Sequence, residues 1–189
     1  MNHSHRILHR SIVIFIFGLA LSGLILTTTG CSGPSHLLDA GLSGPQLVVN
    51  PDTIRLGVAK VMKTVVVFEG MGFEPEEKVM VVLAGTETAN REVVVPMGFG
   101  VADPQGRFTI EVEKTMKIYN LLNADVTFGD KGAIVLVSDP PVPTGVYEAK
   151  ATGYQSSRSA TCRLTLVPPS FIDRIKDRIA RMLGKIEME

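Results

Sequence analysis

The chain has 189 residues, and its 19 basic and 19 acidic side chains give a formal net charge of zero at pH 7. A neutral chain without runs of like charge has no field that would attract a phosphate backbone, so we expect no nucleic-acid partner. The hydrophobic fraction of 45% is sufficient for a buried core, and the length beyond residue 31 corresponds to about one ordinary domain.

The first 30 residues have the pattern of a secretory signal peptide. Basic residues precede an apolar run from Ile12 to Ala20, and Leu24-Ile25-Leu26 follows it. As a helix, residues 12–26 would be roughly 22 Å long, which is shorter than the bilayer core of about 30 Å. We therefore expect residues 1–30 to be a signal peptide that is removed. A transmembrane anchor that is retained is the alternative.

The end of this segment, Thr28-Thr29-Gly30-Cys31, resembles the bacterial lipobox, in which a small residue precedes a cysteine that is diacylated before cleavage. The motif departs at Thr28, where Leu is usual. The resemblance implies a lipoprotein with its lipid on Cys31 and a polar tether within residues 31–46. Such a protein is held in the bacterial cell envelope outside the cytoplasm, and Ser32 is compatible with the outer membrane of a cell that has two. An ordinary signal peptide followed by an unmodified cysteine is the alternative.

Residues 47–167 contain short apolar runs separated by Gly, Pro, Asn and Asp turns. In the clearest run Phe108, Ile110 and Val112 alternate with polar residues. We expect strands at residues 63–69, 78–83, 92–95, 107–113, 133–137, 146–152 and 159–167. Several short strands at regular spacing predict an all-β sandwich or barrel. Residues 114–123 fit either a short helix or a strand with an irregular crossover.

Motifs in this region resemble those of bacterial Ig-like domains. They are a Gly-x-Gly-Phe-x-Pro-Gly-Glu segment at residues 70–77, an Ala-Asp-x-x-Gly-x-Phe hairpin at 102–108, and Pro-x-Gly-x-Tyr and Ala-Thr-Gly elements at 143–147 and 151–153. The chain departs at Glu76, where the family usually has Gly, and in the insertion-like residues 114–130. The resemblance implies an Ig-like antiparallel β-sandwich over residues 47–167.

Residues 168–189 have the pattern of a C-terminal amphipathic helix. Ser170 is a suitable N-cap, and Asp173 gives a capping-box-like start. Apolar residues then recur at three- and four-residue steps, with basic residues on the flanks. The candidate partner contacts are Phe99 and the stripe Ile172, Ile175, Ile179, Met182, Leu183 and Ile186. The stripe can pack on its own domain, lie on a membrane surface, or pair with a partner helix or a second copy.

The residues after Cys31 contain few groups suited to catalysis. His36 is the only histidine left once the signal peptide is removed, and Cys162 has no partner for an intrachain disulfide. No His-based triad, zinc site or Cys–His pair can then be assembled. We expect Cys162 to be a buried, inert thiol because it alternates with apolar residues. We also expect no enzymatic activity, no metal and no cofactor.

The remaining polar motifs fit structural roles. Asp103 and Asp130 lie singly in Gly-containing turns, whereas calcium loops need clustered carboxylates. The glutamates of residues 74–77 form a charged patch that we expect to be a solvated loop. Residues 98–100, Gly-Phe-Gly, lack the Lys and Ser/Thr of a P-loop. They fit a flexible hairpin tip on which Phe99 is exposed or half-buried.

Together these features predict a lipid-anchored envelope protein whose Ig-like domain is a non-enzymatic structural or binding module. The membrane is contacted through the N-terminal lipid, and the partner is an envelope protein or a polysaccharide. The alternative is an accessory subunit of an envelope complex that docks through the C-terminal helix.

Overall fold

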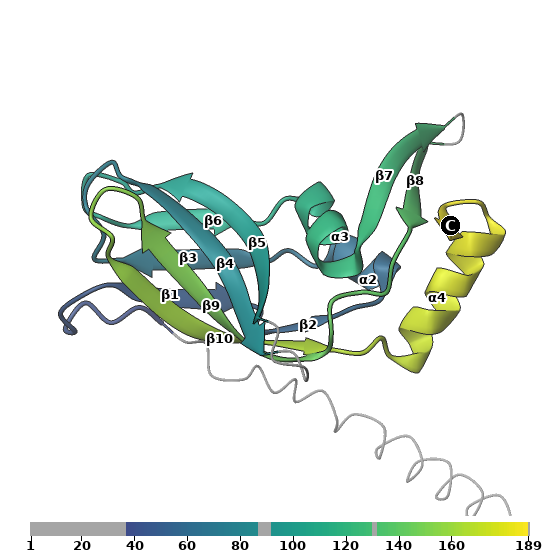
Figure 1. Cartoon of the computed structure of the whole chain (residues 1–189), viewed down its shortest axis with the longest axis horizontal. Coiled ribbons are helices and arrows are strands. Elements are labelled where there is room, and N and C mark those ends of the chain that lie inside the picture. The colour runs from purple at the N-terminus through teal and green to yellow at the C-terminus, as the bar shows by residue number, and fades with distance from the viewer. Residues whose placement is uncertain (1–36, 87–91, 130–131, 189) are drawn as a thin grey trace, which may run out of the picture. The chain divides into compact units, whose positions relative to one another are not determined.

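The computed structural model describes residues 37–86, 92–129 and 132–188. The predicted signal peptide at 1–30, the predicted lipidation site Cys31, His36 and Asp130 lie outside the described residues. The described chain is mostly β and forms several sheets, with a helix near its C-terminus (Figure 1). To this extent the expected all-β class is confirmed. No helix among the described residues is long and apolar enough to cross a membrane.

Two of the sheets face each other across a common core (Figure 1). The first has the order β1-β3-β6, with β1 at Gln46–Asn50, β3 at Val67–Met71 and β6 at Phe108–Glu111. The second has the order β2-β10-β9-β4-β5, with β2 at Thr53–Arg55, β10 at Ser159–Val167, β9 at Gly145–Gly153, β4 at Lys78–Thr86 and β5 at Glu92–Val101. Neighbouring strands are antiparallel, except that β2 runs parallel to β10.

Alternation along the strands sends one set of apolar side chains into the space between the two sheets. The first sheet contributes Phe68, Phe108 and Ile110, and the second contributes Val79, Val81, Leu83, Tyr147, Leu164 and Leu166. The predicted burial of one face of residues 107–113 is thereby confirmed. At the edge of this core the Tyr147 hydroxyl donates a hydrogen bond to the Pro143 carbonyl oxygen at 2.7 Å.

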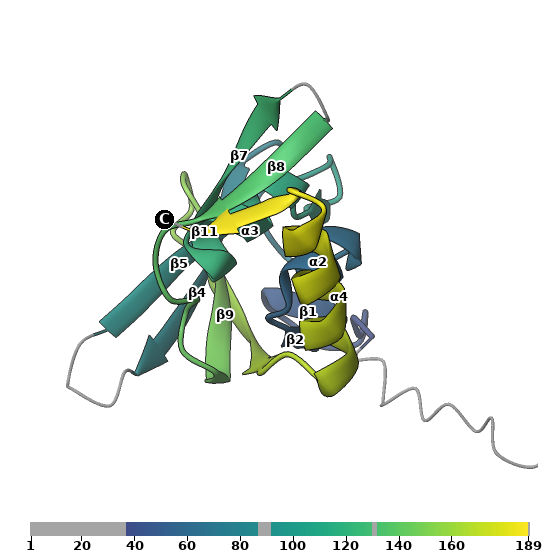
Figure 2. The same ribbon diagram turned by 90° about the vertical axis from the view of Figure 1, so that its right-hand side faces the viewer.

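A third sheet and the helices lie beside this pair of sheets (Figures 1 and 2). The sheet has the order β11-β8-β7, with β7 at Ala124–Gly129, β8 at Gly132–Val137 and β11 at Ile186–Met188. The helices are α2 at Val58–Lys63, α3 at Lys114–Leu122 and α4 at Phe171–Met182. The segment between β6 and β9 and the segment after β10 therefore combine in one unit, because β11 pairs with β8.

One buried lysine holds two of these helices together. The Lys117 ammonium of α3 donates a hydrogen bond to the carbonyl oxygen of Thr64, the C-cap of α2. Burial lowers the pKa of Lys117, while the nearby Glu111 carboxylate acts in the opposite direction. Its apolar stem and satisfied charge make it part of the core between α3 and α2.

Two of the expected elements differ from those in the structure, and one open alternative is decided by it. The run at 63–69 is not one strand, because α2 occupies Val58–Lys63 and β3 begins only at Val67. For residues 114–123 the helical alternative is confirmed by α3. The C-terminal helix does not continue through 189, since α4 ends at Met182 and β11 follows.

Candidate functional site

Helix α4 begins with the capping box that the sequence predicts. The Ser170 hydroxyl accepts a hydrogen bond from the Asp173 amide at 3.2 Å, and the Asp173 carboxylate accepts one from the Ser170 amide at 3.0 Å. The Ser170 hydroxyl also donates to that carboxylate at 2.6 Å. These hydrogen bonds from Ser170 hold the pKa of Asp173 below its ordinary value.

The inner face of α4 is acidic. The Asp177 carboxylate accepts hydrogen bonds from the amides of Val58 at 3.0 Å and Ala59 at 2.9 Å. These amides form the first turn of α2, whose N-cap, Gly57, has no side chain to satisfy them. Gly57 also permits the close approach of α4 to the start of α2, because a Cβ at residue 57 would lie 2.9 Å from the Cβ of Asp173. Helix α4 thus docks on α2 through the Asp177 carboxylate, and Figure 2 shows the two helices next to each other.

The opposite face of α4 is apolar and points into solvent. Two of its side chains are 75% exposed (Phe171) and 81% exposed (Met182). The exposed apolar residues on this side of the helix are Phe171, Ile172, Ile175, Ile179, Met182 and Leu183. We call this set the outer face of α4. The helix packs on its own domain through its acidic face, so the alternative in which the apolar stripe makes this contact is wrong.

Ile186 does not belong to the outer face, although its spacing continues the stripe. Gly184 adopts a positive φ of 65° and ends the helix. The chain then turns into β11, where Ile186 pairs with Val135 of β8 and is buried. Ile186 is therefore a core residue, and its assignment as a partner contact was wrong.

Basic side chains border the outer face of α4. At 3.6 residues per turn the apolar residues cover an arc of about 120°, with Arg174 and Arg178 on one side and Lys176 on the other. All three basic side chains are exposed. The two acidic residues of α4, Asp173 and Asp177, are buried on the inner face. The solvent side of the helix is thus apolar in the middle and positive at its borders.

Phe99, the other proposed contact, lies inside strand β5 and not at a hairpin tip. Its ring is exposed on the outside of the second sheet, next to Met80 of β4. The flanking Gly98 and Gly100 face the core, where a Cβ on either would lie 2.7 Å from Ile110. The two glycines are therefore required by the close packing of Ile110 on β5.

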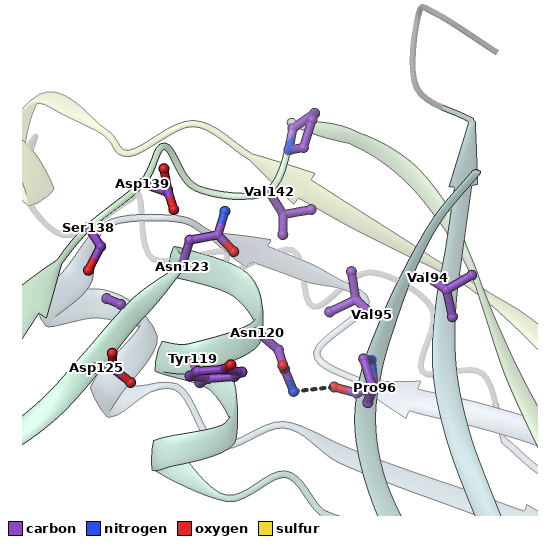
Figure 3. A pocket seen from close by; sticks show the side chains of 12 residues that line it. Val94, Val95, Pro96, Tyr119, Asn120, Asn123, Asp125, Ser138, Asp139 and Val142 are labelled. Atoms are coloured by element: carbon purple, nitrogen blue, oxygen red, sulfur yellow. Dashed lines mark hydrogen bonds between the residues drawn. The ribbon is translucent and has the colours of Figure 1, made fainter. Parts of the chain in front are cut away.

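A hollow of about 540 Å³ lies where α3 and the start of β7 approach β5 (Figure 3). The side-chain amide of Asn120 donates a hydrogen bond to the Pro96 carbonyl oxygen at 2.7 Å, and the side-chain amide of Asn123 donates one to the Pro140 carbonyl oxygen at 2.5 Å. The other polar side chains that line the hollow are Tyr119, Asp125, Ser138 and Asp139. Such a mixture of an aromatic ring with polar groups can hydrogen-bond the hydroxyls of a polar ligand.

The sequence led us to expect a solvated Glu77, but this residue is buried and only 2% exposed. Its carboxylate accepts hydrogen bonds from the Glu74 amide at 2.7 Å and from the Ser156 amide and hydroxyl at 3.2 and 3.0 Å. Burial acts to raise the pKa of Glu77, but these hydrogen bonds outweigh it and the pKa is lowered. The carboxylate joins the loop before β4 to the loop after β9, which is a structural role.

The other residues singled out in the sequence are also structural. The Asp103 carboxylate accepts hydrogen bonds from the amides of Gln105 and Arg107, which closes the hairpin turn as predicted. Cys162 is half-buried, and burial raises the pKa of its thiol to about 11, so little thiolate forms at neutral pH. Within the described ranges, no three His, Cys, Asp or Glu side chains gather closely enough to hold a metal ion.

Sequence reasoning missed the role of Asp177 and the hollow beside α3. Asp177 lies on the same helical face as Asp173, because the two are four residues apart. This spacing is the signal in the sequence that could have indicated an acidic inner face. No signal in the sequence brings Asn120 next to Pro96, because these residues meet only through the packing of α3 on β5.

Comparison with known proteins does not assign the chain to a family. No protein-family model matches it, and no curated protein does. Among solved structures, macromomycin is similar at 18% sequence identity and a TM-score of 0.37, over 66% of this chain and 100% of that chain. A β-glucosidase from Listeria innocua in complex with gluconolactone is similar at 11% identity and a TM-score of 0.36, over 68% of this chain and 17% of that chain. At such TM-scores the likeness assigns neither a fold nor an activity.

Proposed function

We propose that the chain is a lipid-anchored protein of the bacterial cell envelope whose Ig-like domain is a non-enzymatic structural or binding module. Its anchor is Cys31, at the end of the lipobox-like segment. Its domain stands outside the cytoplasm and binds an envelope protein or a polysaccharide.

The strand order supports the Ig-like part of this proposal. In Ig-like sandwiches one sheet contains strands A, B and E and the other contains G, F and C, with C′ added beside C in the variable type. Reading β1, β3 and β6 as A, B and E, and β10, β9, β4 and β5 as G, F, C and C′, reproduces both orders. Residues 114–137 then form an insertion between E and F.

Two local features also support it. Tyr147 lies near the start of β9, and its hydroxyl bonds to the Pro143 carbonyl four residues earlier, as in the tyrosine corner of Ig-like folds. Glu76 adopts a positive φ of 59°, at the position where the Ig-like motif usually has Gly.

The observation that carries the binding role is the outer face of α4. Monomeric soluble proteins rarely expose a large contiguous apolar patch, and such patches mark contacts with a partner or a membrane. This face is held rigidly, because the capping box fixes the start of α4 and Asp177 fixes its docking on α2. The hollow beside α3 is a further place for a polar ligand such as a polysaccharide.

Mass spectrometry of the mature N-terminus, combined with cell fractionation, tests the anchor. We expect an acylated N-terminal Cys31 and a protein in the membrane fraction. The Cys31→Ser chain should lack the acyl chains, whereas the matched control Cys162→Ser should keep them. An unmodified Cys31 in the native protein would contradict the proposal.

The second candidate function is that of an accessory subunit of an envelope complex, and the exposed outer face of α4 favours it as well. In this case α4 would dock on a partner protein. Substitution of Ile175 by Asp should then release a defined partner subunit from the purified native complex, while the domain remains folded.

A further inference from the structure

We infer that the outer face of α4 is a contact site for an anionic lipid surface, in which the helix lies in the plane of the headgroups. This inference rests on the proposed function, since the lipid on Cys31 would hold the domain beside a bilayer. It assigns to the protein a second membrane contact, far from the anchor in sequence.

The exposed side of α4 has the distribution of groups that an interfacial helix needs. Its apolar residues occupy one continuous arc, from Phe171 to Leu183, and none of them is needed by the core of the domain. Helices of this kind lie with the apolar face among the acyl chains and with the basic borders at headgroup level. The acidic side of α4 is turned away from that surface, because Asp173 and Asp177 are buried against the domain.

The charges favour a lipid surface over a second copy of the chain. Arg174, Arg178 and Lys176 are exposed on both borders of the apolar arc, and no acidic side chain of α4 lies on its outer side. Two such faces would bring like charges together if the helix paired with a copy of itself. Long basic side chains can instead bury their stems and extend their charged ends to anionic headgroups.

The anchor and the helix would act together. A single membrane contact of modest affinity becomes effective when a tether already keeps the domain at a high local concentration beside the bilayer. The outer face therefore does not need to bind vesicles strongly by itself. Its engagement would fix the orientation of the domain, with the outer face of α4 toward the membrane.

The chain contains no tryptophan, so one introduced residue reports on one position. We would prepare Phe171→Trp in the full, membrane-processed chain and reconstitute it in vesicles of phosphatidylcholine, with or without phosphatidylglycerol. The matched control is Phe99→Trp, because this ring is also exposed but lies on the second sheet. The readouts are the emission maximum and the quenching by brominated phosphatidylcholine.

We expect the tryptophan at 171 to shift to the blue and to be quenched, more strongly on phosphatidylglycerol vesicles, while the tryptophan at 99 stays solvent-like. Adding Ile175→Asp and Ile179→Asp to Phe171→Trp should reduce the inserted fraction at least about tenfold. Both isoleucines are exposed, so thermal melting should be unchanged. Replacing Arg174 and Arg178 by Glu should remove the preference for phosphatidylglycerol.

Three results would overturn the inference. A solvent-like emission at 171 on both kinds of vesicle would leave the outer face to a protein partner. A blue shift that needs no vesicles and grows with protein concentration would indicate a second copy. Quenching at 99 but not at 171 would place the second sheet against the bilayer. Loss of the anchor alone is detected separately, by the mass of the N-terminal peptide, and protein can then be added to preformed vesicles.

Discussion

The side chain of Asp177 offers the sharpest test of how α4 is attached. Its carboxylate accepts hydrogen bonds from two amides of α2, at 3.0 and 2.9 Å, and it is only 8% exposed. A hydrogen bond to a charged group contributes about 1.5–3 kcal/mol, and replacing an N-cap by Ala costs about 0.5–2 kcal/mol. Because water can reach part of the first turn of α2 after the side chain is removed, we expect Asp177→Ala to lower the free energy of unfolding by about 2–3 kcal/mol.

Urea denaturation of the full chain, followed by circular dichroism, measures this loss. Lys176→Ala is the matched control, because Lys176 precedes Asp177 on the same helix and is exposed; it should change the stability by less than about 0.5 kcal/mol. Asp177→Asn should fall between the two, since one amide oxygen can still accept. If Asp177→Ala were as stable as Lys176→Ala, the carboxylate would not be what docks α4 on α2.

Four further substitutions probe the two facing sheets and the loop before β4. Glu77→Gln should lower the free energy of unfolding by about 2 kcal/mol at neutral pH. Because the folded pKa of Glu77 lies below its ordinary value of 4.5, the carboxylate stabilises the fold above pH 4.5, and this contribution is lost as the pH falls through the folded pKa. Urea titrations in acid should therefore show the wild type and the variant converging in stability. Glu76→Gly should raise the free energy of unfolding by about 1 kcal/mol, because φ is positive there; an unchanged urea midpoint would refute this. Gly98→Ala should cost about 1–3 kcal/mol, because the new Cβ would lie 2.7 Å from Ile110, whereas Gly145→Ala meets nothing within 4 Å and should be neutral.

The elements that were predicted well are those whose signal is local. Alternation identifies β6 and β10, since each places every second side chain in the core. The start of α4 was also predictable, because a Ser followed three residues later by an acid satisfies the first amides of a helix within one turn.

The remaining features depend on contacts between distant residues. Periodicity shows that α4 has an apolar stripe, but it does not show that Asp177 meets Val58, 119 residues earlier in the chain. Glu77 reads as a surface residue until its partner Ser156, 79 residues later, is in place. Ile186 continues the helical spacing, and only the positive φ of Gly184 moves it into a strand.

The central claim is that α4 faces the domain with its acidic side and solvent with its apolar side. The free energy of unfolding of Ile179→Asp in the full chain, measured by urea denaturation, tests this most directly. The orientation described here predicts a change of no more than about 0.5 kcal/mol, because Ile179 is exposed. If the apolar stripe were instead packed on the domain, a buried unpaired charge would lower the stability by roughly 3 kcal/mol or more, and that result would contradict the account.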